Sequence, residues 1–469
     1  MSTFRDIVII GAGAYGAATA LELARLGHRV TVLDQSPNAA AADAAASSDI
    51  NKIIRADYDD VHYRDLCKKA IDLWRTQPLY SKYYHNVGVF FRSGAKVPQE
   101  PLWVTNGVQN AIANVTGFKN KALINEAMPK AVVLRQADDV IKVFPEEVRG
   151  ELGEACVGFN GQSGYFNPNG GWAESGNATR AVLLEAQRHG ATVVPNAEAV
   201  SLVYNGYVNC KPRVSGVRTS DGRVFNAEQV ILAAGSWTPH VLRLFQLSLE
   251  REVLRPSAHC VLMIKIDPAV SVKYEKVPVT FNMNNCFYSF PPNREGILKC
   301  AMHTMGDAHP LPQQHSGSGY PSADGHPILE TMHAELKQLY PRIHLEGPEK
   351  NATVYATRKC WYSDTRDENF LIDFHPHVDG LLVASGDSGH AFKFLPVLGR
   401  LVVSRLLHIE NDSEIAPDIG LSAHQRRVFS YNHHFNINDE LNVTMSTDST
   451  RLKIGSSSPA IVLPFDAKL

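Results

Sequence analysis

The stretch that decides the fold is residues 7–34, IVIIGAGAYGAATALELARLGHRVTVLD. A β-branched run at 7–10 predicts a strand, the Ala- and Leu-rich run at 17–26 predicts a helix, and the run at 29–33 predicts a second strand. Glycines lie at the turn before the helix and directly after it, where a helix starts and stops. A strand, a helix and a strand within about 30 residues predict a βαβ unit and a parallel sheet.

The glycines of the turn follow the pattern Gly11-x-Gly13-x-x-Gly16. Gly11 permits the tight turn, Gly13 lets the backbone approach a pyrophosphate at the helix N-terminus, and Gly16 lets helix and strand pack closely. Asp34 ends the second strand about 20 residues later, where its carboxylate can bind both hydroxyls of an adenosine ribose. An acid at this position favours a free 2′-hydroxyl, which leaves FAD and NAD as candidate dinucleotides.

Length and charge narrow the class of protein further. The chain has 469 residues, with 46 Lys and Arg against 48 Asp and Glu, and a formal net charge of −2. This length predicts two domains. The near-neutral balance argues against nucleic acid or an anionic membrane surface as a partner, and no apolar run approaches the roughly 20 residues of a membrane helix. No secretory signal is visible, so we expect the protein to lie inside the cell. Its composition and charge favour a small-molecule enzyme.

The cysteines argue against a structural metal or a disulfide framework. Their number is odd, they are widely spread and they contain no CxxC pair. We therefore predict no metal site. The seven cysteines are Cys67, Cys156, Cys210, Cys260, Cys286, Cys300 and Cys360.

Later segments predict that the dinucleotide domain is discontinuous. Helices are expected at 63–74, 179–189 and 398–408, and a hairpin around Asp221-Gly222 leads into a buried strand at 230–234. The alternating rhythm of strands and helices is absent from about 240–350. We expect an α/β protein in which a Rossmann-type domain is interleaved with an α+β substrate domain built on a mixed sheet. The expected parts are 1–60, 150–238 and 355–435 for the first domain, 61–149 and 239–354 for the second, and a tail at 436–469.

The buried strand ends in Ala234 and Gly235, and Val200 follows an earlier strand-like run. This arrangement is typical of flavoproteins in which a later strand closes over the adenine. A plain buried strand explains the pattern equally well.

Two stretches near the C-terminus, RKCWYSDTRDENFLIDFHP at 358–376 and GDSGHAFKF at 386–394, resemble the signature of monomeric sarcosine oxidase and its relatives. These relatives are the pipecolate, saccharopine and fructosyl amino acid oxidases. The resemblance extends from GAGAYG through Ile53-Ile54-Arg55 to GHAFKF. It implies an FAD enzyme that oxidises the C–N bond of a secondary amino acid and returns the electrons to oxygen as hydrogen peroxide.

The resemblance assigns roles to single residues. Cys360 matches the cysteine that the family links to the flavin through a thioether, and a thiolate is a suitable nucleophile for that bond. Arg55 and Lys393 match the cations that hold the substrate carboxylate, one as a planar fork and one as a point charge. Lys299 matches the lysine that activates oxygen, since a cation stabilises developing superoxide. Together with Lys299, the two carboxylate-binding cations predict a strongly positive pocket.

Further residues match the family with alternatives left open. Lys52 matches a flavin contact of the fructosyl amino acid oxidases, although a structural or surface role is equally consistent. Tyr288 and Tyr362 match walls of the substrate pocket, although either suits a protein core equally well. Additional cofactor contacts implied by the resemblance come from Ala14, Tyr15, Ser48, Asp387, Gly389 and Phe392.

His303 bears on the substrate branch. Four residues after the oxygen-activating lysine, sarcosine oxidases have a histidine and fructosyl amino acid oxidases a glutamate, so His303 favours an N-alkyl or cyclic amino acid. A core histidine is the alternative. Asn51-Lys52-Ile53 and Asp387 instead resemble the fungal fructosyl and saccharopine branch, and Ala391 replaces the glycine that is usual in the family motif GHGFKF.

We expect hydride transfer from a carbon next to a neutral secondary amine to the flavin. The resulting imine is either hydrolysed or trapped by cyclisation, as in alkaloid-forming relatives in secondary metabolism. The alternatives are a fructosyl amino acid or saccharopine oxidase and, from another class, a flavin dehydrogenase that passes electrons to a quinone or a partner protein. The family resemblance implies a monomer.

The chain ends in Ala467-Lys468-Leu469, which resembles the Ser-Lys-Leu peroxisomal address. The ending predicts recognition by a peroxisomal import receptor. Without that recognition the protein would be cytoplasmic.

Overall fold

The computed structural model describes residues 5–38, 42, 45–58, 60–93, 132–134, 137–153, 163–249, 253–282, 285–304, 306–308, 323–408 and 422–436. All but the first residue of the expected tail at 436–469 lies outside the described residues, and so do the C-terminal tripeptide and Cys156. The described residues form four sheets.

The first sheet confirms the predicted βαβ unit. It has six strands in the order β20-β21-β13-β1-β2-β9, parallel throughout except for the edge pair β20 and β21. The unit itself consists of β1 (Asp6–Ile10), α1 (Ala14–Arg25) and β2 (Arg29–Leu33). The other strands come from distant parts of the chain and are β9 (Thr192–Val194), β13 (Gln229–Leu232), β20 (Leu371–Phe374) and β21 (Leu381–Ser385).

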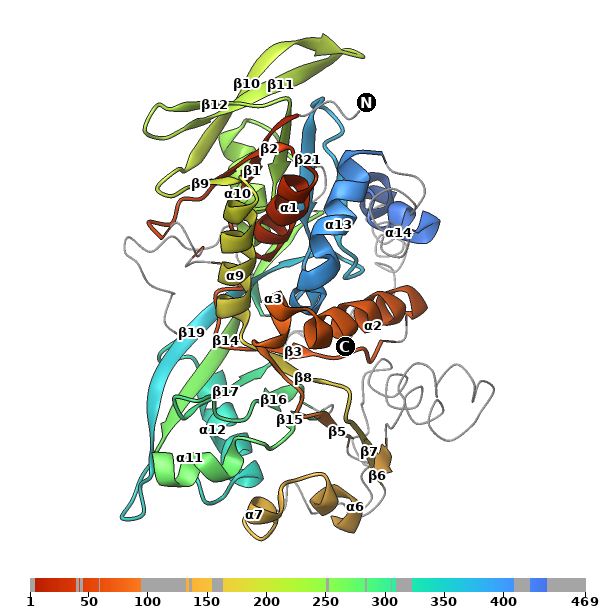
Figure 1. Cartoon of the computed structure of the whole chain (residues 1–469). Helices are drawn as coiled ribbons and strands as arrows, with labels where there is room; N and C mark the ends of the chain where they lie inside the picture. Colours follow the sequence, from red (N-terminus) through yellow and green to blue (C-terminus); the bar gives the residue numbers. More distant parts are fainter. Residues whose placement is uncertain are drawn as a thin grey trace, which may run out of the picture.

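Both faces of this sheet are covered, which explains why β1 is apolar along its length. Ile7 and Ile9 pack in one cluster with residues of α1, α9 (Ser175–Arg188) and α13 (Leu395–Leu406), and Figure 1 shows these helices side by side. Val8 and Ile10 pack in a second cluster on the opposite face. The second cluster includes residues of a three-stranded antiparallel sheet, β10 (Ala199–Val208), β11 (Lys211–Thr219) and β12 (Val224–Asn226).

The hairpin expected around Asp221-Gly222 joins β11 and β12, so that prediction is confirmed. A fourth, small sheet lies between the parallel sheet and the lower part of the molecule in Figure 1. Its strands are β3 (Lys52–Ile54), β8 (Gly171–Ala173) and β4 (Tyr84–His85).

The largest sheet has nine strands and mixes parallel and antiparallel pairs, because β15 pairs parallel with β5 while its other pairs are antiparallel. Its order is β18-β14-β17-β16-β15-β5-β7-β6, with β19 paired to β14. The strands are β5 (Val89–Ser93), β6 (Val132–Leu134), β7 (Ser163–Asn167), β14 (Arg255–Ile266), β15 (Val279–Asn282), β16 (Phe287–Ser289), β17 (Ile297–Met302), β18 (Asp307–Ala308) and β19 (Ala352–Asp364).

Strands β14 and β19 connect the two halves of the molecule. They pair over their whole lengths and extend from beside the parallel sheet to the far end of the large sheet (Figure 1). Both contact the 3-10 turn η1 (Gly235–Trp237), which follows β13. The large sheet is therefore held next to the ends of the parallel strands. The mixed α/β architecture was predicted correctly, and the exact domain bounds stay a prediction.

Helix α2 (Val61–Thr76) extends beyond the predicted 63–74 at both ends. It begins early because Asp60 caps it by accepting hydrogen bonds from the backbone N–H groups of His62 and Tyr63. Helix α9 begins at Ser175, four residues before its predicted start.

Helix α13 begins at Leu395, before the predicted position 398, because Pro396 in its first turn is compatible with a helix start. The remaining helical segments are α3 (Pro78–Ser81), α6 (Ala137–Lys142), α7 (Glu146–Arg149), α10 (Thr238–Leu244), α11 (Pro268–Tyr274), α12 (Ile328–Leu339), η3 (Ala391–Phe394) and α14 (Ala423–Val428).

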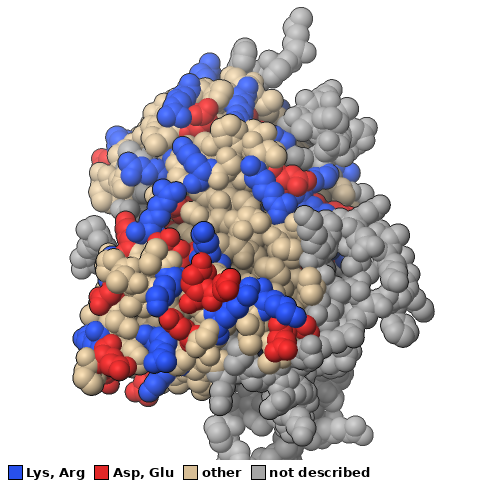
Figure 2. All heavy atoms as spheres, turned by 60° about the horizontal axis from the view of Figure 1, so that its bottom comes forward, with Lys and Arg blue, Asp and Glu red and all other residues tan. Residues whose placement is uncertain are grey.

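None of the helices in the described part of the chain combines the length and the apolar character needed to cross a membrane. On the face in Figure 2, Lys and Arg side chains are interspersed with Asp and Glu side chains, consistent with the near-neutral net charge.

Candidate active site

The glycine turn packs as tightly as its sequence pattern predicts. Gly11 has a φ of +105°, and a Cβ there would lie 2.4 Å from the carbonyl oxygen of Ala233 at the end of β13. A Cβ on Gly16 would lie 1.8 Å from the carbonyl oxygen of Gly11. Gly13 is the N-cap residue of α1 and contributes no side-chain cap. The first-turn N–H groups therefore face the space beyond the turn without a capping side chain.

The surroundings of this turn fit a dinucleotide. Asp34 accepts hydrogen bonds from the N–H groups of Ala12 (2.7 Å) and Ser36 (2.8 Å), so its carboxylate is fixed next to the turn. The hydroxyl of Tyr15 is buried and has no hydrogen-bond partner among the described residues. An uncapped helix N-terminus, a fixed acid and a buried polar atom without a partner together suit a pyrophosphate and a ribose.

The three residues predicted to lie near the adenine differ in position. The Cα of Ala234 would lie 3.2 Å from a Cβ on Gly11, so it borders the glycine turn. Gly235 begins η1 with a φ of +52°. Val200 is half-buried at the start of β10, and Ala197 just before it donates a hydrogen bond to the carbonyl of Asp34 (2.8 Å).

The large sheet presents most of the other predicted residues on one face. Directly opposed residues of paired strands point to the same side of a sheet, and alternate residues of one strand do so as well. The opposed pairs are His259 with Cys360, Ser257 with Tyr362, Met263 with Lys299, and Tyr288 with Ala301. Cys360, Tyr362, Lys299, Tyr288 and His259 therefore share one face, which we call the site face.

Asp49 binds two of the predicted lysines. The Lys299 Nζ donates hydrogen bonds to Asp49 Oδ2 (2.6 Å) and to the carbonyl of Asn51 (2.8 Å), and the Lys52 Nζ donates to the same carboxylate oxygen (2.6 Å). Arg358 lies 3.7 Å from Asp49 Oδ1. Burial disfavours ionisation of Asp49, but the three cations outweigh it and hold its pKa well below the usual range. Burial lowers the pKa of Lys299 to about 8, although Asp49 opposes the shift.

Lys52 also contacts the predicted flavin tether. Its Nζ lies 3.7 Å from the Sγ of Cys360, which is 1% exposed. Burial disfavours the charged lysine, but Asp49 outweighs burial and raises the pKa of Lys52. The side-chain amide of Asn51, next in the chain, is fully buried and has no hydrogen-bond partner within the described residues.

Arg55 and Lys393 form a second buried pair of cations. The guanidinium carbon of Arg55 lies 5.3 Å and the Nζ of Lys393 lies 5.0 Å from the ring centroid of Tyr58. Lys393 donates hydrogen bonds to the hydroxyl of Tyr58 (2.7 Å) and the carbonyl of His390 (3.0 Å). Arg55 donates to the carbonyl of Asp57. Burial, and then the neighbouring Arg55, lower the pKa of Lys393 to about 7.

His303 lies close to this pair. Burial, and then Arg55 and Lys393, lower its pKa to about 4, so the imidazole is neutral at neutral pH. Its ring centroid lies 6.1 Å from that of Tyr362, which shares a side-chain hydrogen bond with Tyr288. The cation pair, His303 and the two tyrosines therefore border one region.

The motif at 386–394 closes over the same region. Asp387 accepts hydrogen bonds from the backbone of Ser363 and of Gly389, both at 3.1 Å, and burial raises its pKa to about 6. A Cβ on Gly389 would lie 2.5 Å from the ring of Tyr362, so only glycine lets this loop approach the tyrosine.

Three more predicted cofactor contacts have a defined place in the structure. Phe392 packs against Trp74, with ring centroids 5.8 Å apart. The carbonyl of Ser48 accepts a hydrogen bond from Arg358 (2.6 Å). Ala14 is the first residue of α1.

Sequence reasoning missed the acids and several polar neighbours. The expected cluster of cations is present, but Asp49 and Asp57 are buried within it, so the pocket is less positive than predicted. Tyr58, His259 and Arg358 also belong to the site. The spacing of Asp49 and Lys52 is a local signal, whereas the contact between Asp49 and Lys299 joins residues 250 positions apart and has none.

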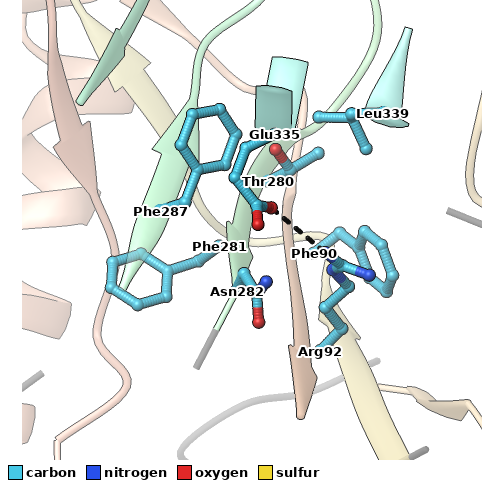
Figure 3. A pocket seen from close by; sticks show the side chains of 8 residues that line it. All are labelled: Phe90, Arg92, Thr280, Phe281, Asn282, Phe287, Glu335 and Leu339. Carbon is cyan, nitrogen blue, oxygen red and sulfur yellow. Dashed lines mark ion pairs between the residues drawn. The ribbon is translucent and has the colours of Figure 1, made fainter. Parts of the chain in front are cut away.

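A cavity in the large sheet lies mainly on the face opposite the site face, although its wall residue Phe281 is opposed to Tyr288. Figure 3 shows it between β5, β15, β16 and α12, with the ion pair of Arg92 and Glu335 (3.5 Å) across it. Its wall residue Phe287 precedes Tyr288 on the same strand and therefore points to the opposite side of the sheet.

Comparisons with known proteins support a flavoenzyme. A family model described as "DAO: FAD dependent oxidoreductase" matches residues 6–405. The L-saccharopine oxidase of Schizosaccharomyces pombe is 28% identical over 430 residues, which cover 86% of this chain and 90% of that protein. The monomeric sarcosine oxidase of a Bacillus species is 25% identical over 432 residues, which cover 89% of this chain and 95% of that protein.

Among solved structures, the fructosamine oxidase of Aspergillus fumigatus (Amadoriase II) is similar, with a TM-score of 0.71 and 26% identity over 94% of this chain and 92% of that one. The resemblance found in the sequence is thereby confirmed. The chain belongs to the DAO family of FAD-dependent oxidoreductases.

Proposed function

We propose that this chain is an FAD-dependent oxidase of secondary amino acids. The observation that carries the proposal is the buried cation pair of Arg55 and Lys393 beside neutral His303, next to the site face with Lys299 and Cys360. Two adjacent buried cations are costly unless an anion joins them. The carboxylate of an amino acid supplies that anion, and the fork of Arg55 and the point charge of Lys393 suit it.

His303 favours N-alkyl and cyclic amino acids as substrates. A neutral imidazole beside the cation pair offers a hydrogen bond to an amine without the negative charge of a glutamate. Two similar proteins, named for saccharopine and sarcosine, support a secondary amine as the reacting group. A fructosyl amino acid is the second candidate, supported by the similarity to the fructosamine oxidase structure.

The residues of the chain have separate tasks in this proposal. Arg55 and Lys393 bind the carboxylate and thereby orient the substrate, while Tyr288 and Tyr362 form rigid walls that exclude water. FAD, when bound, would supply the two-electron acceptor for the substrate and the route of those electrons to oxygen, so that the products would be an imine and hydrogen peroxide. Water hydrolyses the imine, or a nucleophile of the same molecule cyclises onto it.

We assign the remaining site residues to the cofactor and to oxygen. The glycine turn, Asp34 and Lys52 would hold FAD, and Cys360 would bind it covalently. The ammonium group of Lys299 would stabilise charge that develops on oxygen. The contacts expected from Ser48, Val200, Ala234, Asp387, Gly389 and Phe392 belong to the same proposal.

The test is anaerobic bleaching of the flavin absorbance by a substrate panel. The panel consists of sarcosine, N-methyl aromatic amino acids, pipecolate, saccharopine and fructosyl amino acids. We expect an N-alkyl or cyclic amino acid to bleach the flavin, and the corresponding amine without a carboxylate to fail. If a fructosyl amino acid alone bleaches it, the second candidate is correct. If no compound does, the proposal is wrong.

Oxygen use separates an oxidase from a flavin dehydrogenase. An oxidase consumes oxygen and releases hydrogen peroxide in step with substrate, and Lys299→Met should slow reoxidation strongly while leaving anaerobic bleaching intact. Equal reoxidation in both proteins would favour electron transfer to a quinone or a protein. We further propose that the protein is a monomer and that Ala467-Lys468-Leu469 directs it to peroxisomes, which its removal would prevent.

A further inference from the structure

Three residues that the proposed function does not use form a hydrogen-bonded chain. His259 Nε2 lies 3.1 Å from the Oγ of Ser257, and that hydroxyl donates to Asp364 Oδ2. His259 and Ser257 are buried, whereas Asp364, at the end of β19, is partly exposed. The chain therefore leads from the interior toward the solvent.

The hydrogen bonds fix the position of the imidazole proton. A serine hydroxyl has a single proton, and Ser257 donates it to the carboxylate of Asp364. Its oxygen therefore accepts from Nε2–H of His259, which leaves a lone pair on Nδ1. This Nδ1 is buried without a hydrogen-bond partner among the described residues. A buried acceptor without a hydrogen bond is costly, so its retention points to a donor that the described residues do not supply.

His259 borders the proposed substrate region. Its ring is stacked on Tyr362, with centroids 3.9 Å apart and an interplanar angle of 24°. It is also nearly parallel to the ring of His303 at 5.8 Å. Because it lies opposite Cys360 on the site face, a substrate amine held between Tyr362 and His303 is the nearest chemically suitable donor.

We propose that His259, Ser257 and Asp364 are a relay that removes the proton from the secondary ammonium group of the substrate. This proposal rests on the proposed function. The pKa of an alkyl ammonium such as that of lysine is about 10, so the substrate arrives protonated. Its nitrogen then has no lone pair to assist hydride release. A group that removes this proton supplies the reactive neutral amine.

The transfer balances. The N–H bond of the ammonium breaks and a bond from hydrogen to Nδ1 of His259 forms. The proton on Nε2 moves to the Oγ of Ser257, and the original hydroxyl proton of Ser257 moves to Asp364. The products are a neutral amine, a neutral imidazole and a protonated carboxyl group, with no change in oxidation state and no lasting buried imidazolium.

The environment of the relay narrows the pKa difference between the ammonium group and the final acceptor. Burial, and then His303 and Lys52, lower the pKa of His259 well below its usual value, so the imidazole passes the proton on. Burial raises the pKa of Asp364 to about 7, although the hydrogen bond from Ser257 opposes the shift, so the carboxyl group can accept a proton near neutral pH. The other titratable and charged groups that face the relay are Tyr362 and Cys360 on β19, Asp387 after β21 and Arg255 on β14.

The experiment is anaerobic flavin reduction as a function of pH in Ser257→Ala. This variant interrupts the relay and keeps both His259 and Asp364. With a substrate whose amine is ionised, we expect reduction about 10- to 100-fold slower than wild type near neutral pH, and no difference near pH 10, where the amine is deprotonated in solution. Asp364→Asn should follow the same profile.

Two controls isolate the relay from packing. Ser289→Ala removes an equally buried hydroxyl that bonds to Thr280 (2.7 Å) on the other side of the sheet, and it should keep the wild-type profile. A thioether analogue with sulfur in place of the amine carries no such proton, and it should bind Ser257→Ala and wild type with equal affinity.

The outcomes separate the two proposals. If Ser257→Ala and Asp364→Asn keep the wild-type pH profile, or lose the same factor at every pH, the relay is wrong and the oxidase remains. If no amino acid of the panel reduces the wild-type flavin, the oxidase is wrong and the relay with it.

Discussion

At the scale of single residues, buried charges organise this site. The side chains of Asp49 and Lys299 are each at most 1% exposed, Lys299 Nζ lies 2.6 Å from Asp49 Oδ2, and Lys52 binds the same carboxylate oxygen. An ion pair without solvent is sensitive to the loss of one partner, because the remaining charge is left uncompensated. Asp49 is therefore the residue on which the charge of both lysines depends.

Asp49→Asn should slow the reaction with oxygen more than the reaction with substrate. Without the carboxylate the pKa of Lys299 falls below about 8, so less of the lysine is protonated at neutral pH. We expect reoxidation of the reduced flavin to slow about 10- to 100-fold, measured by stopped flow with added oxygen. Asp373→Asn, which loses an ion pair with Arg405 outside the site, controls for general destabilisation. Unchanged reoxidation in folded Asp49→Asn would contradict the assignment.

Lys393 should make substrate binding dependent on pH. With a pKa lowered to about 7, it is protonated below that pH and neutral above it in the enzyme without substrate. We expect KM for a carboxylate substrate to rise between about pH 7 and 9 while kcat changes little, and Lys393→Arg to flatten the rise because arginine stays charged. A flat KM in the wild type would contradict this prediction.

The lowered pKa of Lys393 also makes the free energy of unfolding depend on pH. Between about pH 7 and pH 10.5 the unfolded chain binds more protons at Lys393 than the folded chain does. The contribution of Lys393 to the free energy of unfolding therefore increases with pH across this window.

At the scale of elements, close backbone contacts position the site. Helix α1 lies against the glycine turn so closely that a Cβ on Gly16 would lie 1.8 Å from a carbonyl oxygen of the turn. The same helix contacts α13, where a Cβ on Gly399 would lie 2.1 Å from the carbonyl oxygen of Ala18. Glycines at these two positions let the helix N-terminus lie at the end of β1.

Gly16→Ala should therefore destabilise the protein strongly. The added methyl group has no space unless α1 moves away from β1, and overpacking of this kind costs more than about 2 kcal/mol. Urea unfolding of the purified protein would measure the loss. Gly150→Ala is the matched control, since no heavy atom lies within 4 Å of its Cβ position, and it should unfold like wild type. Equal stability of the two variants would contradict the packing argument.

At the scale of the whole molecule, the site joins elements that are far apart in sequence. Lys299 on β17 and Cys360 on β19 share one face because β14 pairs with both strands, and Lys52 on β3, in another sheet, contacts Cys360 there. Bound FAD would contact all of these segments. Its binding free energy should therefore add to the stability of the entire fold.

A covalent link through Cys360 predicts a difference in melting temperature. Wild type should melt at a temperature independent of added FAD, and acid precipitation should leave the yellow colour in the pellet. Cys360→Ala should release its colour and gain stability from added FAD, about 2.7 kcal/mol at 100 times the dissociation constant. Cys300→Ala, which alters the strand residue next to Lys299, should behave like wild type. Colour retained in the Cys360→Ala pellet would contradict the link.

The sequence by itself determined the βαβ unit, the glycine turn and the family, because these depend on local periodicity and on motifs within short stretches. It also indicated the cations Arg55, Lys299 and Lys393 through the family motifs. Only the tertiary structure decided which charges meet. Asp49 joins Lys299 across 250 residues, and His259 reaches Asp364 through Ser257 across two paired strands. Strand register sets such contacts, and register depends on the packing of whole sheets rather than on any local pattern.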